Sequence, residues 1–358
     1  MKKILFLING GKTQFANSLI SYIEKEFPFY EKEYCVLDRR MQQKLPNKKN
    51  IHRVLSYKEF LFNRTLRKYF IETDKIIVSG LFTAQYVMFL FFNRYLKKTY
   101  FQFWGGDFYF LLNSCNIKNK FKKKVNGYCI KKSAGIILLL GREKDKFLKV
   151  FPFAKNKKFF FTPIPFSEKE EQIFKKYRTL ITDVQNHSVK RILVGNSATE
   201  TNKHHEIFDI ISDCGFIDVE IICPLSYGNP LYRDEVIKEG KKLFGDLFIP
   251  IVEFMDFEEY TKLLMTCSVG IYNFERQQGL GNIFALVNMG KKVFLNQENP
   301  AFVNLSELGF NFEIVSQIKN LTEEQFFEWP DEKRKQNIQA VNKFKDNMLK
   351  QWTKILND

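Results

Sequence analysis

The chain has 358 residues, of which 45% are hydrophobic, and it carries a net charge of +16. This length exceeds what one core normally holds and predicts two domains of about 150 residues each. The longest apolar stretch, residues 81–92, is well short of the roughly 20 residues that span a bilayer. We therefore expect a protein that is soluble or lies on a membrane without crossing it.

In residues 1–165, short apolar runs alternate with helical patterns. The pattern predicts an amphipathic helix at 15–26 and strands at 4–8, 33–37, 75–79, 98–104, 135–140 and 157–162. Strands separated by helical stretches imply a parallel sheet that is covered on both faces. The charged, polar segment 166–188 is predicted to be a linker.

Residues 189–358 contain a second series of the same kind. Strands are predicted at 191–194, 219–223, 247–251, 269–272 and 292–295, and a charged helical segment closes the chain at 322–356. The two series predict an α/β protein with two Rossmann-like, doubly wound domains that face each other across a cleft. Ligands of open α/β sheets bind outside the carboxyl ends of the strands, so we expect the site in that cleft.

A small polar loop follows the first strand of the second domain. It begins with Gly195, Asn196 and Ser197, and Asn202 stands where the next helix should begin, as a residue type common at helix N-caps. Free amides and the positive end of a helix dipole suit a phosphate. An ordinary turn between a strand and a helix has the same composition, so both interpretations stay open.

A second polar loop follows the strand predicted at 269–272. Its residues are Arg276, Gln277, Gln278, Gly279, Gly281 and Asn282. The glycines allow close backbone approach, the arginine can pair with a phosphate, and the glutamine amides can bond sugar hydroxyls or a base. The Gly-x-Gly lacks the full dinucleotide spacing and is weak evidence for NAD.

In the first domain, Asp107 lies in an aromatic, glycine-lined loop at a strand end. Such a carboxylate is suited to act as a general base with a raised pKa. A residue that caps a helix or braces a loop has the same setting.

Motifs of several other enzyme classes are absent from the sequence, which has no Asp-x-Asp, no P-loop and no Gly-x-Ser-x-Gly. The adjacent His204 and His205 point to different sides of a helix and make a poor metal site, although His204 is placed to cover a phosphate. The six cysteines lack zinc spacing and are expected to be free thiols. We expect no metal and no cofactor.

As a set, these segments resemble the TDP-N-acetylfucosamine:lipid II N-acetylfucosaminyltransferases, glycosyltransferase family 56. The family's WG-small-DLY segment corresponds to Trp104, Gly105, Gly106, Asp107, Phe108 and Tyr109. Its GNS, N-x-H and RQQGxG motifs correspond to Gly195, Asn196, Ser197, Asn202, His204, Arg276, Gln277, Gln278, Gly279 and Gly281. A Pro and a Tyr after the next strand, and an LN-x-ENP motif, appear as Pro224, Tyr227, Leu295, Asn296, Glu298, Asn299 and Pro300.

The resemblance covers roughly residues 75–315 and implies a GT-B fold without a metal. It implies a TDP-sugar donor held by the second domain and an undecaprenyl-diphosphate-linked glycan as acceptor. The implied donor-binding residues are those of the GNS, N-x-H and RQQGxG motifs, together with Tyr227, Asn282 and Asn296. If the reaction inverts the anomeric centre, Asp107 is the candidate base for the acceptor hydroxyl.

Two other functions fit parts of the sequence. A UDP-sugar 2-epimerase has the same architecture, but it needs an acid and base set where we find only Asp107 and scattered histidines. A nucleic-acid-binding protein would explain the charge, but the basic residues do not concentrate in one motif, so we expect no nucleic acid partner. The lysine-rich segment 118–124 instead predicts docking on an anionic membrane, at the inner face of a bacterial cytoplasmic membrane.

Overall fold

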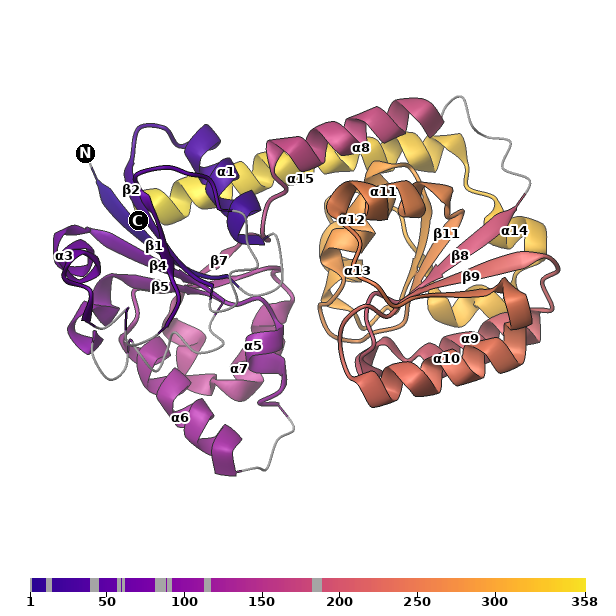
Figure 1. The fold of residues 1–358 in the computed structure, drawn as a ribbon, viewed down its shortest axis with the longest axis horizontal. Helices are drawn as coiled ribbons and strands as arrows, with labels where there is room; N and C mark the ends of the chain where they lie inside the picture. Colours follow the sequence, from indigo (N-terminus) through magenta and orange to yellow (C-terminus); the bar gives the residue numbers. More distant parts are fainter. Residues whose placement is uncertain are drawn as a thin grey trace. The chain divides into compact units, whose positions relative to one another are not determined.

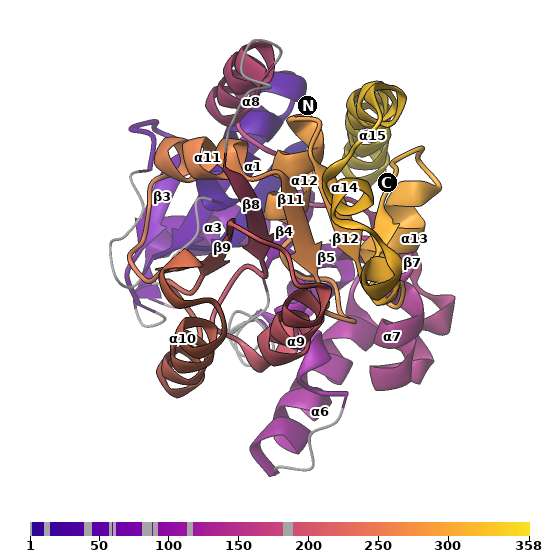
Figure 2. The same cartoon turned by 90° about the vertical axis from the view of Figure 1, so that its right-hand side faces the viewer.

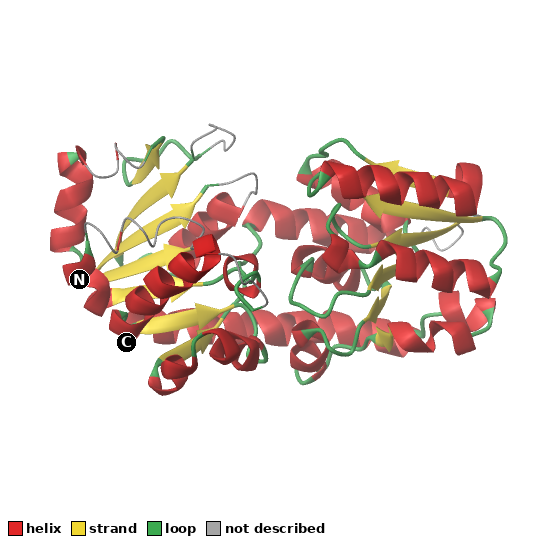
Figure 3. Cartoon of the chain, turned by 90° about the horizontal axis from the view of Figure 1, so that it is seen from below, coloured by secondary structure: helices red, strands yellow, loops and turns green. Residues whose placement is uncertain are grey.

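Two parallel β-sheets carry the fold (Figure 1). The computed structural model describes residues 2–10, 15–38, 45–56, 59, 62–80, 88, 92–112, 117–181 and 189–358. One compact unit comprises Met1–Glu168 and Asn347–Asp358, and the other comprises Lys169–Asp346. Strands and helices alternate in both units, as predicted (Figure 3).

The described part of the first sheet has seven parallel strands in the order β3-β2-β1-β4-β5-β6-β7. The strands are β1 Lys3–Asn9, β2 Glu31–Leu37, β3 Ile51–Val54, β4 Lys75–Ser79, β5 Thr99–Gln102, β6 Gly135–Leu138 and β7 Lys158–Phe161. The helices between them are α1 Phe15–Glu26, α3 Arg64–Glu72, α5 Gly106–Tyr109, α6 Ile117–Lys132 and α7 Glu143–Val150, with short 3₁₀ turns at Asn93–Lys98 and Pro152–Asn156.

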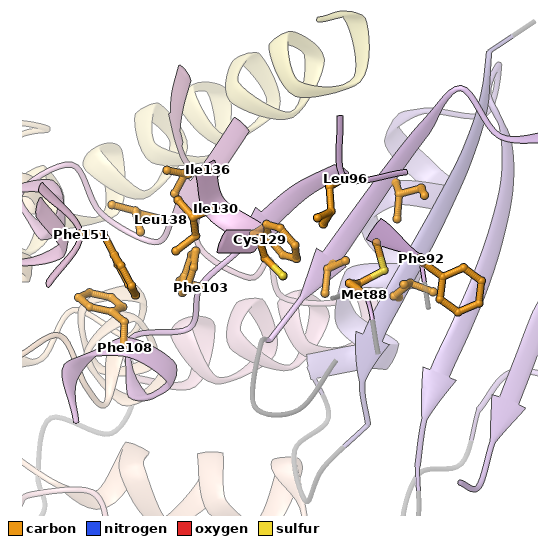
Figure 4. Packing of buried hydrophobic residues seen from close by; sticks show 14 of the residues in the cluster. Met88, Phe92, Leu96, Phe103, Phe108, Cys129, Ile130, Ile136, Leu138 and Phe151 are labelled. Carbon is orange, nitrogen blue, oxygen red and sulfur yellow. The ribbon is translucent and has the colours of Figure 1, made fainter. Parts of the chain in front are cut away.

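Each face of the first sheet buries its own hydrophobic core. Alternate residues of β1 divide between the two, because Ile4 and Phe6 pack with α1 whereas Leu5 packs with α3 and α6. On the latter face, Phe103 meets Phe108 edge-on with ring centroids 6.0 Å apart (Figure 4). These two buried rings fix both ends of the segment that carries Trp104 and Asp107.

The second sheet has the order β10-β9-β8-β11-β12-β13 and is also parallel. Its strands are β8 Lys190–Val194, β9 Val219–Pro224, β10 Phe248–Ile251, β11 Val269–Tyr272, β12 Lys292–Leu295 and β13 Glu313–Ile314. Its helices include α9 His204–Cys214, α10 Pro230–Phe244, α11 Phe257–Thr266, α12 Leu280–Asn288, α13 Pro300–Ser306 and α14 Glu323–Phe327. Helices α9 and α10 cover one face, and α11 and α12 cover the other (Figure 2).

The predicted linker contains a helix, α8 (Glu168–Ile181), most of which belongs to the second unit. Phe174 of α8 packs against Phe257 with ring centroids 5.4 Å apart. The Nε of Arg178 donates to the backbone oxygen of Asn288 at 2.8 Å. This amphipathic helix therefore packs on α11 and α12, which a purely charged linker would not do.

The end of the chain also differs from the expected domain at 189–358. Helix α15 (Asp331–Asn357) starts in the second unit, but its last residues belong to the first. Trp352, Ile355 and Leu356 are fully buried with Phe6 in the core on the α1 face. Burial of these apolar side chains explains why the segment leaves the unit in which its helix begins.

Within the described residues, no helix combines the length and the apolar character that crossing a bilayer requires.

Candidate functional site

The strand order of the second sheet reverses between β8 and β11. The helices that follow these two strands, α9 and α12, lie on opposite faces of the sheet (Figure 2). Such a reversal opens a crevice at the carboxyl ends of the strands, where doubly wound folds bind their ligands. Both polar loops of the second domain lie at this point, because one follows β8 and the other follows β11.

Hydrogen bonds join these two loops. Gln278 Nε2 donates to Asn196 Oδ1 at 2.9 Å, and Asn196 Nδ2 donates to the hydroxyl of Tyr227 at 2.8 Å. Thr201 Oγ1 donates to Gln278 Oε1 at 2.7 Å. Arg276 Nη2 donates to Thr201 Oγ1 at 3.3 Å. The structure therefore brings together residues that lie up to 82 positions apart in the sequence.

Asn202 does not cap α9, contrary to the prediction. It is fully buried, and its Oδ1 accepts from the backbone N–H of Asn196 at 3.0 Å. Its Nδ2 donates to the backbone oxygen of Ser197 at 2.8 Å. Lys203, in the left-handed region at φ 55°, stands at the N-cap position instead. The amide holds the β8–α9 loop in one conformation because it bonds the backbone of Asn196, Ser197 and Thr199.

Gly195 is required by the shape of the same loop. Its φ is +67°, and a Cβ atom there would lie 2.8 Å from His204 Nε2 and 2.9 Å from Asn202 Oδ1. His204 is fully buried, and burial lowers its pKa to about 3, so its imidazole is neutral at physiological pH. His204 Nδ1 lies 3.2 Å from the hydroxyl of Tyr232. We conclude that His204 is a neutral side chain that packs against Gly195 and supports the loop.

The remaining predicted donor-site residues differ in their exposure to solvent. Ser197 and Gln277 are buried, Tyr227 is 51% exposed, and Gly281 is exposed. Gly279 stands before α12 with φ +60°. Asn282 belongs to a separate contact, because its Nδ2 donates to the hydroxyl of Tyr260 at 2.8 Å.

Asn296 is also outside the joined loops. Its Nδ2 donates to Asn273 Oδ1 at 3.0 Å, and Asn273 Nδ2 donates to Glu206 Oε2 at 3.0 Å. Sequence reasoning missed Asn273, and it missed Thr201. Thr201 lies in a polar run, and Asn273 directly follows a strand. Each lies next to a motif that was recognised, and that position was the only signal for them.

In the first unit, Asp107 is almost fully buried in α5. Its Oδ1 and Oδ2 accept from the backbone N–H of Trp104 at 3.0 and 3.1 Å. The carboxylate therefore braces its loop, as one of the two interpretations of the sequence held.

A second buried carboxyl group, Glu143, was not recognised from the sequence. Its Oε2 accepts from the backbone N–H of Leu140 at 3.0 Å. Burial, and to a lesser extent the charge of Asp107, raises the pKa of Glu143 to about 8. Glu143 is thus largely protonated at neutral pH.

Glu143 predicts a pH dependence of stability. Its folded pKa, about 8, exceeds the ordinary value of 4.5, so the folded state binds the extra proton between these values. The resulting stabilisation is complete below pH 4.5 and is lost as pH rises through 8. In the wild-type protein the free energy of unfolding should fall by a few kcal/mol, on the order of the pKa shift, between pH 5 and 8. Glu143→Gln should remove this fall, which urea unfolding measures. Asp145→Asn, an exposed change on the same helix, should leave the loss in place; an unchanged loss in Glu143→Gln would contradict the assignment.

The chemistry of the joined loops is that of an anion and hydroxyl site. Backbone N–H groups, amides, hydroxyls and the guanidinium of Arg276 gather there. Among the described residues, no group of three His, Cys, Asp or Glu side chains is placed to hold a metal ion. Amide, hydroxyl and guanidinium donors of this kind recognise phosphate and sugar oxygens.

Solved structures with this fold include several sugar-transferring enzymes. HepE from Anabaena, in complex with UDP and glucose, has a TM-score of 0.67 at 12% identity, covering all of both chains. A glycosyltransferase from Rickettsia africae ESF-5 has a TM-score of 0.68 at 16% identity, covering 99% and 97% of the chains. A UDP-forming α,α-trehalose-phosphate synthase from Burkholderia xenovorans has a TM-score of 0.66 at 10% identity, covering 98% and 97%. At these identities the likeness shows the fold, which is GT-B.

The predicted fold class is thereby confirmed, and the protein is an enzyme of the glycosyltransferase class. The model of a family described as 4-alpha-L-fucosyltransferase, glycosyl transferase group 56, matches residues 71–358. The chain belongs to this family, as its motifs predicted.

Proposed function

We propose that this glycosyltransferase moves a TDP-linked deoxy-amino sugar to an undecaprenyl-diphosphate-linked glycan during bacterial surface polysaccharide synthesis. The observation that carries the proposal is the hydrogen-bonded junction of Asn196 and Gln278 at the strand reversal of the second sheet. Both residues belong to family motifs, and the junction lies where such sheets bind ligands.

The diphosphate of the donor would lie over the β8–α9 loop. Ser197 and the N-terminal turn of α9 offer backbone N–H groups. Gly195 lets the loop turn at a positive φ, and Arg276 offers a cation held by Thr201. Departure of a nucleoside diphosphate builds negative charge on its phosphate oxygens, and fixed donors and a cation stabilise that charge. In this proposal Asn202 and His204 support the loop, and Gly279 and Gly281 allow close approach of the donor. The donor site is completed by the side chains of Tyr227, Gln277, Gln278, Asn282 and Asn296.

The first unit would take the acceptor. Asp107 is its candidate base, since removal of the hydroxyl proton must accompany attack on the anomeric carbon if the reaction inverts. Both carboxylate oxygens of Asp107 accept from the N–H of Trp104 in the structure. Proton uptake requires one of them to reach the acceptor hydroxyl while the other keeps that hydrogen bond.

A transfer assay tests the function as a whole. Purified enzyme is mixed with dTDP- or UDP-linked deoxy-amino sugars and with undecaprenyl-diphosphate-linked glycans from bacterial membranes, in EDTA. We expect release of dTDP that depends on the lipid-linked glycan and yields a longer lipid-linked product. Strict dependence on magnesium or manganese, or epimerised sugar nucleotide without transfer, would contradict the proposal.

Helix α6 is the proposed contact with an anionic membrane, which would place the enzyme at the inner face of the cytoplasmic membrane. Its first turns expose Ile117 (83%) and Phe121 (60%) among exposed lysines. Lys122 differs from its neighbours because its Nζ lies 4.1 Å from the ring centroid of Phe110. Basic side chains attract an anionic leaflet, and exposed apolar side chains can enter the interface.

Charge reversal on α6 should release the protein from anionic vesicles. Each basic residue near such a surface contributes about 1 kcal/mol, so the triple change at Lys120, Lys123 and Lys124 to Glu should weaken binding by at least about tenfold. Vesicle flotation measures this, with Lys122 left in place to preserve its packing. The matched control changes three exposed lysines of α10 to Glu: Lys238, Lys241 and Lys242. Equal flotation of both triple variants would show that α6 is not the contact.

A further inference from the structure

The first sheet has a strand reversal of its own, between β1 and β4. Strand β1 ends at Asn9, and β4 ends at Ser79, with Gly80 next in the chain. A Cβ atom on Gly80 would lie 3.1 Å from the indole carbons of Trp104 and 3.1 Å from the Cβ of Asn9. Trp104 therefore lies at the point of this sheet where doubly wound folds bind ligands.

Trp104 is held in place through two N–H groups. Its indole N–H donates to Ser79 Oγ at 3.0 Å, and Ser79 Oγ donates to Gln102 Oε1 at 2.6 Å. Gln102 Nε2 donates in turn to the backbone oxygen of Thr162 at 3.4 Å. The backbone N–H of Trp104 donates to the carboxylate of Asp107. Three buried polar side chains, those of Ser79, Gln102 and Asp107, thus form or support the bonds that orient one ring, together with the backbone oxygen of Thr162.

Glycine at position 80 lets the ring lie against the backbone. Gly80 has φ +79°, a conformation that other residues rarely adopt, and a side chain there would press on the indole. Phe15, the first residue of α1, meets Trp104 edge-on with ring centroids 5.5 Å apart and is 41% exposed. Trp104 itself is only partly buried. The two rings form a fixed aromatic surface, which we call the Trp104–Phe15 platform.

We infer that the Trp104–Phe15 platform stacks against a pyranose ring of the acceptor glycan. The inference rests on the proposed function and adds to it the sugar-binding surface of the first unit. Because the indole N–H is already bonded to Ser79, the ring offers an apolar π face, which suits the C–H face of a sugar. The amide of Asn9 beside it can bond a sugar hydroxyl. An apolar face with a few polar groups at its edge is the usual form of a small-ligand site.

Intrinsic fluorescence tests this inference directly. Of the three tryptophans, Trp329 and Trp352 are buried, so shielding from acrylamide quenching reports chiefly on Trp104. The probes are octyl glucoside, octyl N-acetylglucosaminide and octyl glucuronide at submicellar concentrations, with octyl tetraethylene glycol as the control without a sugar. We expect saturable shielding by at least one glycoside and none by the control, and loss of the shielding in Trp104→Phe.

A second variant avoids dependence on the fold around Trp104. Phe15→Ala removes an exposed ring and should weaken glycoside binding about 2- to 10-fold. Phe29→Ala, which removes a ring that is 83% exposed in the turn after α1, should have no effect. Equal shielding by octyl tetraethylene glycol, shielding that persists in Trp104→Phe, or equal affinity in Phe15→Ala and Phe29→Ala would overturn the inference. Titration with dTDP in parallel separates the two proposals, because the nucleotide can fail to bind while glycosides still shield Trp104.

Discussion

Replacement of Asp107 by asparagine is expected to lower turnover by about 10²- to 10⁴-fold, the usual contribution of a general base. The asparagine Oδ1 can still accept from the N–H of Trp104, so the loop should keep its conformation. Affinity for a nucleoside diphosphate should not change, because Asp107 belongs to the first unit and the proposed donor site to the second.

The matched control is Asp74→Asn. Asp74 also accepts a backbone N–H, that of Lys3 at 2.8 Å, but it lies before β4 at the opposite end of the sheet. Both variants remove one negative charge and leave one oxygen that can accept the backbone N–H. If Asp107→Asn turns over as fast as Asp74→Asn, then Asp107 is a brace for Trp104 and not a base.

Replacement of Trp352 by alanine should destabilise the first unit by about 3–5 kcal/mol, as large truncations of buried aromatic residues do. Its side chain is fully buried, and its ring lies 6.4 Å from that of Phe6. The expected result is a lower melting temperature for the calorimetric transition of the first unit.

Leu349→Ala is the control for Trp352, because Leu349 is 37% exposed on the same helix. Its effect should stay within about 1 kcal/mol. A transition of the first unit that is equally stable in both variants would show that the last turns of α15 do not belong to its core.

The strands were predictable because parallel strands buried on both faces form continuous apolar runs. Of the six strands predicted in residues 1–165, β4 matches residue by residue, and the others differ by a few residues at their ends. Strand β3 was missed, since Ile51–Val54 contains His52 and Arg53, whose polar side chains break the apolar run. Its position is fixed instead by pairing with β2 at the edge of the sheet.

Contacts distant in sequence could not be predicted. Trp352 and Phe6 are 346 positions apart, and no local pattern shows that they share a core. The same holds for Gln278 and Asn196, whose motifs were recognised separately before the structure joined them. For Asn202, the local pattern gave a wrong prediction. Its residue type is common at helix N-caps, but in the structure its side chain bonds the backbone of Asn196 in the same loop.

Binding of a nucleoside diphosphate at the junction of Asn196 and Gln278 is the central claim, and calorimetric titration of dTDP and UDP tests it most directly. Asn196→Ala removes both hydrogen bonds that link Asn196 to Gln278 and Tyr227. We expect dTDP to bind the wild-type protein more tightly than UDP, and we expect Asn196→Ala to weaken dTDP binding about 10- to 100-fold. Asn320→Ala, an exposed change in the same unit, should leave the affinity unchanged. Equal dTDP affinity in the wild-type protein and in Asn196→Ala, or no binding of either nucleotide, would contradict the claim.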